Sequence, residues 1–207
     1  MLPINKVAVP NLLTTEREYS PQQEGNHRNV LRLFFTQLVS SLNAIITWRD
    51  DNHNWMSGWD TNIQTIADPT QAYVVQVNNI DPNSVGFTVD DTYTVTTPIA
   101  GLYILQFSLQ ITNSSTGNTE AASAWARLNG TDMVDSRSTV SIHQSHGGLN
   151  GSGILTVIFT LFLKAGDRIQ LMWTGTSTDL SLETLPVSVT PPMPASPSVI
   201  ASIFQVA

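Results

Sequence analysis

Apolar positions between residues 27 and 48 recur with a helical period. Leu31, Phe35, Leu38, Leu42 and Ile45 are spaced four, three, four and three residues apart. This is the a/d stripe of a heptad pattern, and it predicts an α-helix over residues 27–48, with Asn26 as its N-cap. An isolated helix of that length is marginal in water. The stripe therefore indicates that the helix either docks on the following domain or assembles with copies of itself.

From residue 72 onward the period changes to that of β-strands. Residues 102–111 alternate strictly, with Tyr103, Phe107 and three aliphatic side chains on one face. Asn129-Gly130 between two apolar runs predicts a tight hairpin. About ten short strands separated by turn residues are typical of an antiparallel sandwich or jelly roll. We expect a mainly β protein in which residues 72–207 form a jelly-roll domain.

Residues 1–25 show no periodicity and contain three prolines, so they are predicted to form an extended arm. The arm still carries many apolar side chains, which favours docking in a groove of another protein over a simple disordered tail. The alternative, a disordered tail in the isolated protein, stays open. The side chains expected to anchor the arm to a particle are Ile4, Val7, Val9, Leu12, Leu13 and Tyr19.

Residues 26–71 are predicted to hold the helix and a tryptophan-rich connector. Trp48, Trp55 and Trp59 fall within twelve residues of one another among polar neighbours. A small packed turn region between helix and sheet is the favoured interpretation. The sharper alternative is a platform on which Trp55 and Trp59 stack a host glycan.

Composition narrows the possible functions. Charged residues make up 12% of the chain, and 24 Thr and 20 Ser replace the missing charge. This pattern suits a β protein with hydroxyl-rich surfaces. The net charge of −7 argues against binding nucleic acid, which needs Lys and Arg to displace counterions. No apolar run is long enough for a membrane-spanning helix and the N-terminus is a poor secretory signal, so we expect no membrane insertion and synthesis in a cytoplasm.

No chemical motif points to catalysis. Cysteine is absent, which excludes disulfides and thiolate chemistry. His143 and His146 fall in a glycine-rich loop rather than on a helix, so loop histidines are favoured over a metal pair. We expect no enzyme activity, no catalytic residue, no metal site and no cofactor.

Four segments resemble the jelly roll of tumour necrosis factor and the complement globular head. Thr97-Pro-Ile-Ala-Gly-Leu-Tyr-Ile-Leu-Gln-Phe107 is similar to the Pro-x-x-Gly-x-Tyr-x-x-x-Phe strand of that family. Ala126-Arg-Leu-Asn-Gly-Thr131, Leu161-Phe-Leu-Lys-Ala-Gly-Asp-Arg-Ile-Gln-Leu171 and Ser198-Val-Ile-Ala-Ser-Ile-Phe204 resemble later segments in the same order, although the last lacks the family's glycine. The resemblance covers residues 90–207 and implies a homotrimer. It makes Tyr103, Phe107, Leu161 and Leu163 core or trimer-contact residues, and Leu31, Phe35, Leu38, Leu42 and Ile45 the contacts of a trimeric helix stem.

The N-terminal half carries a second resemblance. Arg17-Glu-Tyr19, followed after a polar gap by Leu31-Arg-Leu-Phe-Phe-Thr-Gln-Leu38, is similar to the N-termini of structural proteins of tailed bacteriophages. This resemblance implies a homotrimeric virion protein, assembled in the host cytoplasm and exposed on the virion surface, that decorates or cements the capsid or forms a short head fibre. Its partners would be other capsid or tail proteins. The alternative is a trimeric tail-fibre or receptor-binding protein that recognises host surface glycans, and a glycan-active enzyme is a third hypothesis without a positive signal.

Overall fold

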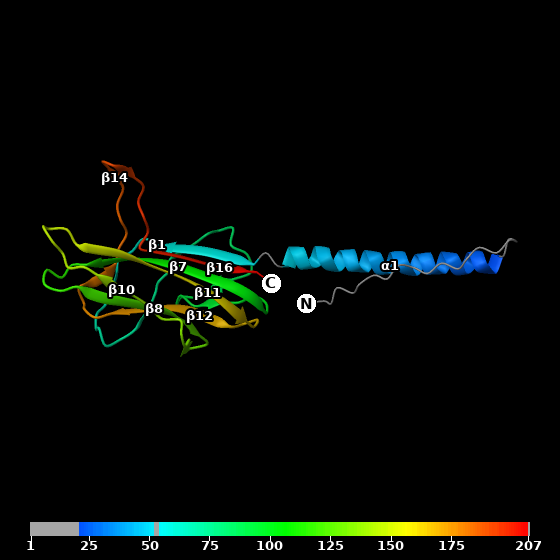
Figure 1. Ribbon diagram of the computed structural model, residues 1–207, viewed down its shortest axis with the longest axis horizontal. Coiled ribbons are helices and arrows are strands. Elements are labelled where there is room, and N and C mark those ends of the chain that lie inside the picture. Colours follow the sequence, from blue (N-terminus) through cyan, green and yellow to red (C-terminus); the bar gives the residue numbers. More distant parts are fainter. Residues whose placement is uncertain (1–20, 52–53, 207) are drawn as a thin grey trace. The chain divides into compact units, whose positions relative to one another are not determined.

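The computed structural model describes residues 21–51 and 54–206, which fall into two compact units separated between His53 and Asn54 (Figure 1). Helix α1, Pro21–Asp51, accounts for the described part of the first unit. The helix predicted for residues 27–48 is confirmed, but the arm predicted to reach residue 25 is wrong for residues 21–25. Proline suits the first helical turn because its missing N–H has no helical partner there. Glu24 lies in the same turn, next to the positive end of the helix dipole.

The second unit consists of strands joined by turns. The long strands are β1 (Trp55–Asp60), β7 (Gly101–Asn113), β8 (Glu120–Leu128), β10 (Ser138–Ile142), β11 (Gly151–Leu163), β12 (Arg168–Gly175) and β16 (Val199–Gln205). The short ones are β2 (Gln64–Thr65), β3 (Tyr73–Val74), β4 (Asn79–Ile80), β5 (Thr88–Val89), β6 (Val95–Thr96), β9 (Thr131–Asp132), β13 (Leu180–Leu182), β14 (Ser188–Val189) and β15 (Pro192–Met193).

These strands form two antiparallel sheets that face each other (Figure 1). In the first, which we call the β7 sheet, β7 pairs with β11 on one side and with β16 and β13 on the other, followed by β1, β2 and β4. In the second, the β12 sheet, β12 lies between β8 and the short strands β3 and β6, and β10 forms the far edge. The predicted antiparallel jelly-roll sandwich is confirmed.

The β unit begins earlier than the sequence indicated. A domain starting at residue 72 was expected, with the tryptophans in a connector, but Trp55–Asp60 is a strand that pairs with β16 along its whole length. Met56 from this strand enters the core. The connector prediction is therefore wrong, because the tertiary pairing with the last strand of the chain determines the structure of a segment whose own composition resembles a turn.

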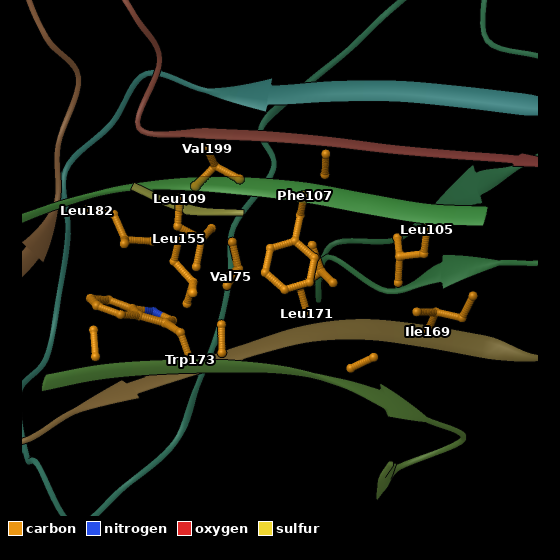
Figure 2. Close-up of a cluster of buried hydrophobic side chains, with 14 of the residues drawn as sticks. Val75, Leu105, Phe107, Leu109, Leu155, Ile169, Leu171, Trp173, Leu182 and Val199 are labelled. Atoms are coloured by element: carbon orange, nitrogen blue, oxygen red, sulfur yellow. The ribbon is translucent and has the colours of Figure 1, made fainter. Parts of the chain in front are cut away.

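The core lies between the two sheets (Figure 2). Figure 2 shows Phe107 and Leu109 of β7 facing Leu171 and Trp173 of β12. Trp173 is the largest side chain in the core, with 1% of its surface exposed. Since the inward positions of each strand alternate with outward ones, burial in this layer fixes which residues remain on the outer faces.

The hairpin predicted at Asn129-Gly130 is confirmed. Asn129 and Gly130 both adopt positive φ, 51° and 81°, and join Leu128 of β8 directly to Thr131 of β9. A two-residue hairpin of this type requires positive φ at both central positions, which Asn and Gly tolerate. A further hairpin, β14–β15, stands off from the sandwich (Figure 1).

Candidate functional site: an uncharged sheet face

The outward face of the β7 sheet exposes large apolar side chains among uncharged polar ones. We call it the outer face, and define it by the outward residues of β1, β16, β7 and β11, together with Val206. On β11 the inward residues are largely buried, whereas Ile158 and Phe162 on the opposite side are 61% and 72% exposed. The apolar members of the outer face are Trp55, Trp59, Leu102, Ile104, Ile154, Ile158, Phe162, Ile200, Phe204 and Val206.

Strand pairing arranges these side chains in rows. Trp55 lies opposite Phe204, and Phe204 lies opposite Ile104. One row further, Phe162 lies opposite Leu102. Directly paired residues bring their side chains into contact on one face of the sheet, so these two rows form one apolar patch. A polar row of Ser57, Ser202 and Gln106 separates this patch from Trp59 and Ile200.

The polar members of the outer face carry no charge. They are serine, threonine and glutamine residues such as Ser57, Gln106 and Thr156. The strands of the β7 sheet contain one charged residue, Asp60, and its exposed fraction is 0%. An exposed sheet face that combines aromatic and aliphatic side chains without a charge is the composition of a protein–protein contact.

The margin of this face is an open strand edge. Among the described residues, β11 pairs with β7 alone along its thirteen positions, so its other side presents unpaired backbone groups. β11 contains neither Lys, Pro nor any other residue that natural proteins use to block strand addition. His143 and Ile142 lie against the start of this edge, at Gly151 and Gly153. The rest of the edge continues directly into the outer face.

Helix α1 carries a second uncovered apolar stripe. Phe35 and Leu42, two of the predicted stem contacts, are 56% and 49% exposed, and Leu31 is also exposed, while Leu38 is half-buried. Ile45 belongs to the helix but lies outside the residues whose side chains are described. Phe34 stacks edge-on against Phe35, with ring centroids 5.5 Å apart, which places aromatic surface beside the stripe.

The structure distributes the other predicted site residues differently. Tyr103, Phe107, Leu161 and Leu163 all point into the sandwich and are buried, so they belong to the core and leave no surface for a neighbouring subunit. The core role in that prediction is confirmed. The strand period of two places the alternate residues, such as Leu102 and Phe162, on the outer face instead. The six predicted anchor residues lie outside the described residues.

Trp55 and Trp59 lie together on β1, both on the outer face. Trp59 is exposed and Trp55 is half-buried. Sequence reasoning missed the face to which they belong. The sequence did hold a signal for this face. The run from Ile154 to Leu163 is apolar at most of its outward positions as well as its inward ones, and a strand that is buried on both faces loses the alternation of apolar and polar residues.

Charge is concentrated on the opposite sheet and its turns. Arg127 of β8 pairs with Asp132 and Arg168 of β12 pairs with Asp90, each at 2.6 Å. The Arg127 guanidinium holds the pKa of Asp132 below its usual value, and hydrogen bonding from Thr92 does the same for the pKa of Asp90. The two outer faces of the sandwich therefore differ sharply in their electrostatics.

Within the described ranges, no group of three or more His, Asp or Glu residues is placed to hold a metal ion. In the same part of the chain, no helix is long and apolar enough to cross a membrane.

Comparison with protein-family models gave no match, and comparison with curated proteins gave none. Among solved structures, the chain is similar to Eiger TNF from S. frugiperda, with 15% sequence identity and a TM-score of 0.49. That similarity covers 75% of this chain and 94% of the Eiger chain.

Proposed function

We propose that this chain is a structural protein that works as a homotrimer, with α1 as its stem and the outer face of the β7 sheet as the contact between sandwiches. The observation that carries the proposal is the outer face, which exposes large apolar side chains and no charge. In water such a surface is costly to leave exposed, and its burial contributes roughly 25 cal/mol for each Å² of apolar area. A second and third copy of the same chain offer the same chemistry.

The helix supports an assembly of more than two chains. In the heptad frame of its stripe, Phe35 and Leu42 take a positions, while Leu31, Leu38 and Ile45 take d positions. Two-stranded coiled coils favour a β-branched residue at a, and none is present there. Leu at a followed by Ile at d, as at positions 42 and 45, favours higher oligomers.

The virion assignment rests on the resemblance of residues 15–46 to structural proteins of tailed bacteriophages. In this proposal the N-terminal residues anchor the chain to other virion proteins, and the trimeric sandwich decorates or cements the capsid or forms a short head fibre. Three linked weak contacts on one rigid body gain affinity through effective concentration, which suits attachment to a repeating lattice. The protein would act at the virion surface without catalysis.

A receptor-binding role at the tail is the second candidate. It is supported by Trp59, which is exposed, and by Trp55, which lies four residues earlier on the same face of β1, because an exposed aromatic ring can stack a sugar. Both rings belong to the outer face, so a trimer that buries this face would withdraw them from solvent. The two roles therefore compete for the same residues.

The native mass of the full-length chain, measured by light scattering, tests the assembly. We expect three times 22.6 kDa for the natural sequence. Ile158→Glu places a carboxylate on the β11 side of the outer face and should give a monomer, because an unpaired charge buried in an interface costs ~2–5 kcal/mol. Ser141→Glu adds the same charge to an exposed position of β10, on the other sheet, and should leave the trimer intact.

A natural chain that is monomeric would contradict the proposal, as would an Ile158→Glu variant that remains trimeric. Gold labelling of intact particles then separates the two biological roles. Label around the head supports decoration, and label at the tail supports receptor binding.

A further inference from the structure

A polar cleft opens at the lateral edge of the sandwich, on the side away from β11. Its volume is about 360 Å³, within the range of small-molecule sites. β2 of one sheet contributes one wall, and β3 of the other contributes the opposite wall. The lining residues are Ile63, Gln64, Thr65, Tyr73, Val74, Gln76, Tyr93 and Trp173.

Several parts of the cleft are held in place by contacts within the protein. The hydroxyl of Tyr73 accepts a hydrogen bond of 2.7 Å from the backbone N–H of Asp68. The side-chain amide of Gln64 is fixed by Asp60 and by the backbone of Gln76. Trp173 forms part of the lining while remaining 1% exposed. A site whose walls are already ordered loses little conformational entropy when a ligand binds.

Other polar groups of the cleft are available to a ligand. No described residue forms a hydrogen bond with the side chains of Thr65, Gln76 or Tyr93, although the backbone of Gln76 is paired. Together they supply two hydroxyl groups and one amide, which can both donate and accept. The rings of Tyr73 and Tyr93, both half-buried, complete the cleft.

The backbone holds Tyr93 in an unusual conformation. Its φ is +56°, a value that side-chain-bearing residues other than Asn and Asp seldom adopt. The turn is fixed by a 2.9 Å hydrogen bond from the N–H of Tyr93 to the carbonyl of Asp90, and by another from Asp90 to the carbonyl of Thr94. Strain of this kind concentrates at binding sites, where it positions one side chain.

The chemistry of the lining limits the class of ligand. No charged side chain lines the cleft, so it offers nothing to neutralise a phosphate or a carboxylate. Its hydrophilic groups make it a poor site for a lipid chain, which would leave them without partners. A pyranose ring has an apolar face of C–H groups for an aromatic side chain and a rim of neutral hydroxyls for amides and hydroxyls.

We propose that this cleft binds a neutral carbohydrate, with Tyr93 and Tyr73 against the sugar ring and Gln76 and Thr65 bonded to its hydroxyls. The site is separate from the outer face and does not depend on trimer formation. A sugar can therefore bind here even when Trp55 and Trp59 are covered by a neighbouring subunit.

Saturation-transfer NMR on the full-length protein tests the proposal. The probes are galactose, glucose, mannose, fucose and N-acetylglucosamine, each at ~10 mM because a site that holds one sugar ring binds weakly. Adenosine serves as a flat, neutral competitor of another class. Tyr93→Asn removes the ring with a residue that tolerates positive φ, so the turn should persist. Gln76→Ala removes the free amide, and Gln144→Ala is its matched control on an exposed loop.

We expect at least one sugar to receive magnetisation, with binding lost in Tyr93→Asn and weakened about tenfold in Gln76→Ala, equal to the loss of one good hydrogen bond. Gln144→Ala should bind as the natural protein does. If Tyr93→Asn fails to fold, Gln76→Ala alone decides. The proposal would be overturned if none of the sugars bound, or if neither Tyr93→Asn nor Gln76→Ala changed the binding. It would also be overturned if adenosine displaced the bound sugar more strongly than another sugar did.

Discussion

The side-chain amide of Gln64 pairs with the backbone of Gln76 in both directions. Its nitrogen donates to the carbonyl of Gln76 and its oxygen accepts from the N–H of the same residue, each at 2.9 Å. Gln64 belongs to β2 of the β7 sheet, whereas Gln76 follows β3 of the β12 sheet. One side chain thus reproduces the pairing of a strand residue and joins the two sheets at their open edge.

The same amide also supports a buried carboxylate. Gln64 donates to Asp60, which receives further hydrogen bonds from the side chains of Asn62 and Asn78. Asp60 is 0% exposed, and the side chains that donate to it are neutral amides. Gln64→Ala removes one of these donors and leaves the backbone of Gln76 unpaired.

We expect Gln64→Ala to lower the free energy of unfolding by ~2–4 kcal/mol, because buried polar groups without partners lose their hydration and gain nothing in return. Urea unfolding followed by tryptophan fluorescence measures the change. Gln71→Ala, an exposed glutamine before β3, provides the control and should shift stability by less than ~0.5 kcal/mol. Equal effects of the two substitutions would show that the bridge contributes nothing.

The turn at Asp167 predicts a specific response to acid. Hydrogen bonds from the side chain of Asn129, at 2.9 Å, and from the backbone N–H of Lys164 hold the pKa of Asp167 below its usual value of 3.8. A carboxyl whose pKa is lower in the folded state stabilises the fold above the unfolded pKa. That contribution disappears as the pH falls below 3.8 and through the lower folded pKa.

NMR titration of the Asp167 carboxyl should therefore report a pKa under 3.8 in the natural protein and a higher one in Asn129→Ala, which lacks the first donor. Thermal unfolding of Asn129→Ala should change less between neutral and acidic pH than that of the natural protein. A carboxyl pKa that does not move in Asn129→Ala would rule out this explanation.

Gly151 begins β11 where no side chain fits. A Cβ at this position would lie 1.8 Å from the carbonyl oxygen of His143, which is backbone and cannot rotate away. Gly151→Ala should therefore force the start of β11 from its place and destabilise the β unit by ~2–4 kcal/mol. Gly117→Ala is the matched control, because a Cβ there meets nothing within 4 Å. Thermal unfolding of both variants checks the prediction, and a Gly151→Ala variant as stable as Gly117→Ala would contradict it.

A substitution at Tyr103 distinguishes a role in the core from a role in the contact between subunits. Its ring is buried and its hydroxyl donates to the carbonyl of Ile99 at 2.8 Å. Tyr103→Phe should cost ~1 kcal/mol of stability through that single hydrogen bond while leaving the native mass unchanged. Light scattering and urea unfolding on the same sample test both halves. A change in mass without a loss of stability would return Tyr103 to the subunit interface.

Local patterns predicted much of this architecture. The strict alternation around Phe107 corresponds to β7, and the apolar run ending at Leu163 corresponds to β11. The Asn129-Gly130 dipeptide encoded its own hairpin through the conformations that these two residues tolerate. The heptad stripe marked the helix, although its start was placed six residues late.

Long-range pairing explains what the sequence concealed. The inward positions of β1 are Met56, Gly58 and Asp60, a set that contains one large apolar side chain and a carboxylate. The sequence of such a strand resembles that of a turn. Asn78, which donates to Asp60, and β16, which pairs with β1, both come from more distant parts of the chain. The cleft was equally hidden, because Tyr73 and Tyr93 line it only once β3 and the β5–β6 pair have both joined β12.

Because the outer face of the β7 sheet carries no charge, an assembly built on it should tolerate a wide range of salt concentration. Dissolved ions largely screen the interaction between exposed charges more than about 10 Å apart at moderate ionic strength, whereas kosmotropic salts strengthen apolar burial. Contacts among Trp59, Ile158 and Phe162 offer them nothing to screen. An assembly held together by this face would keep its subunits from dilute fresh water to concentrated brine.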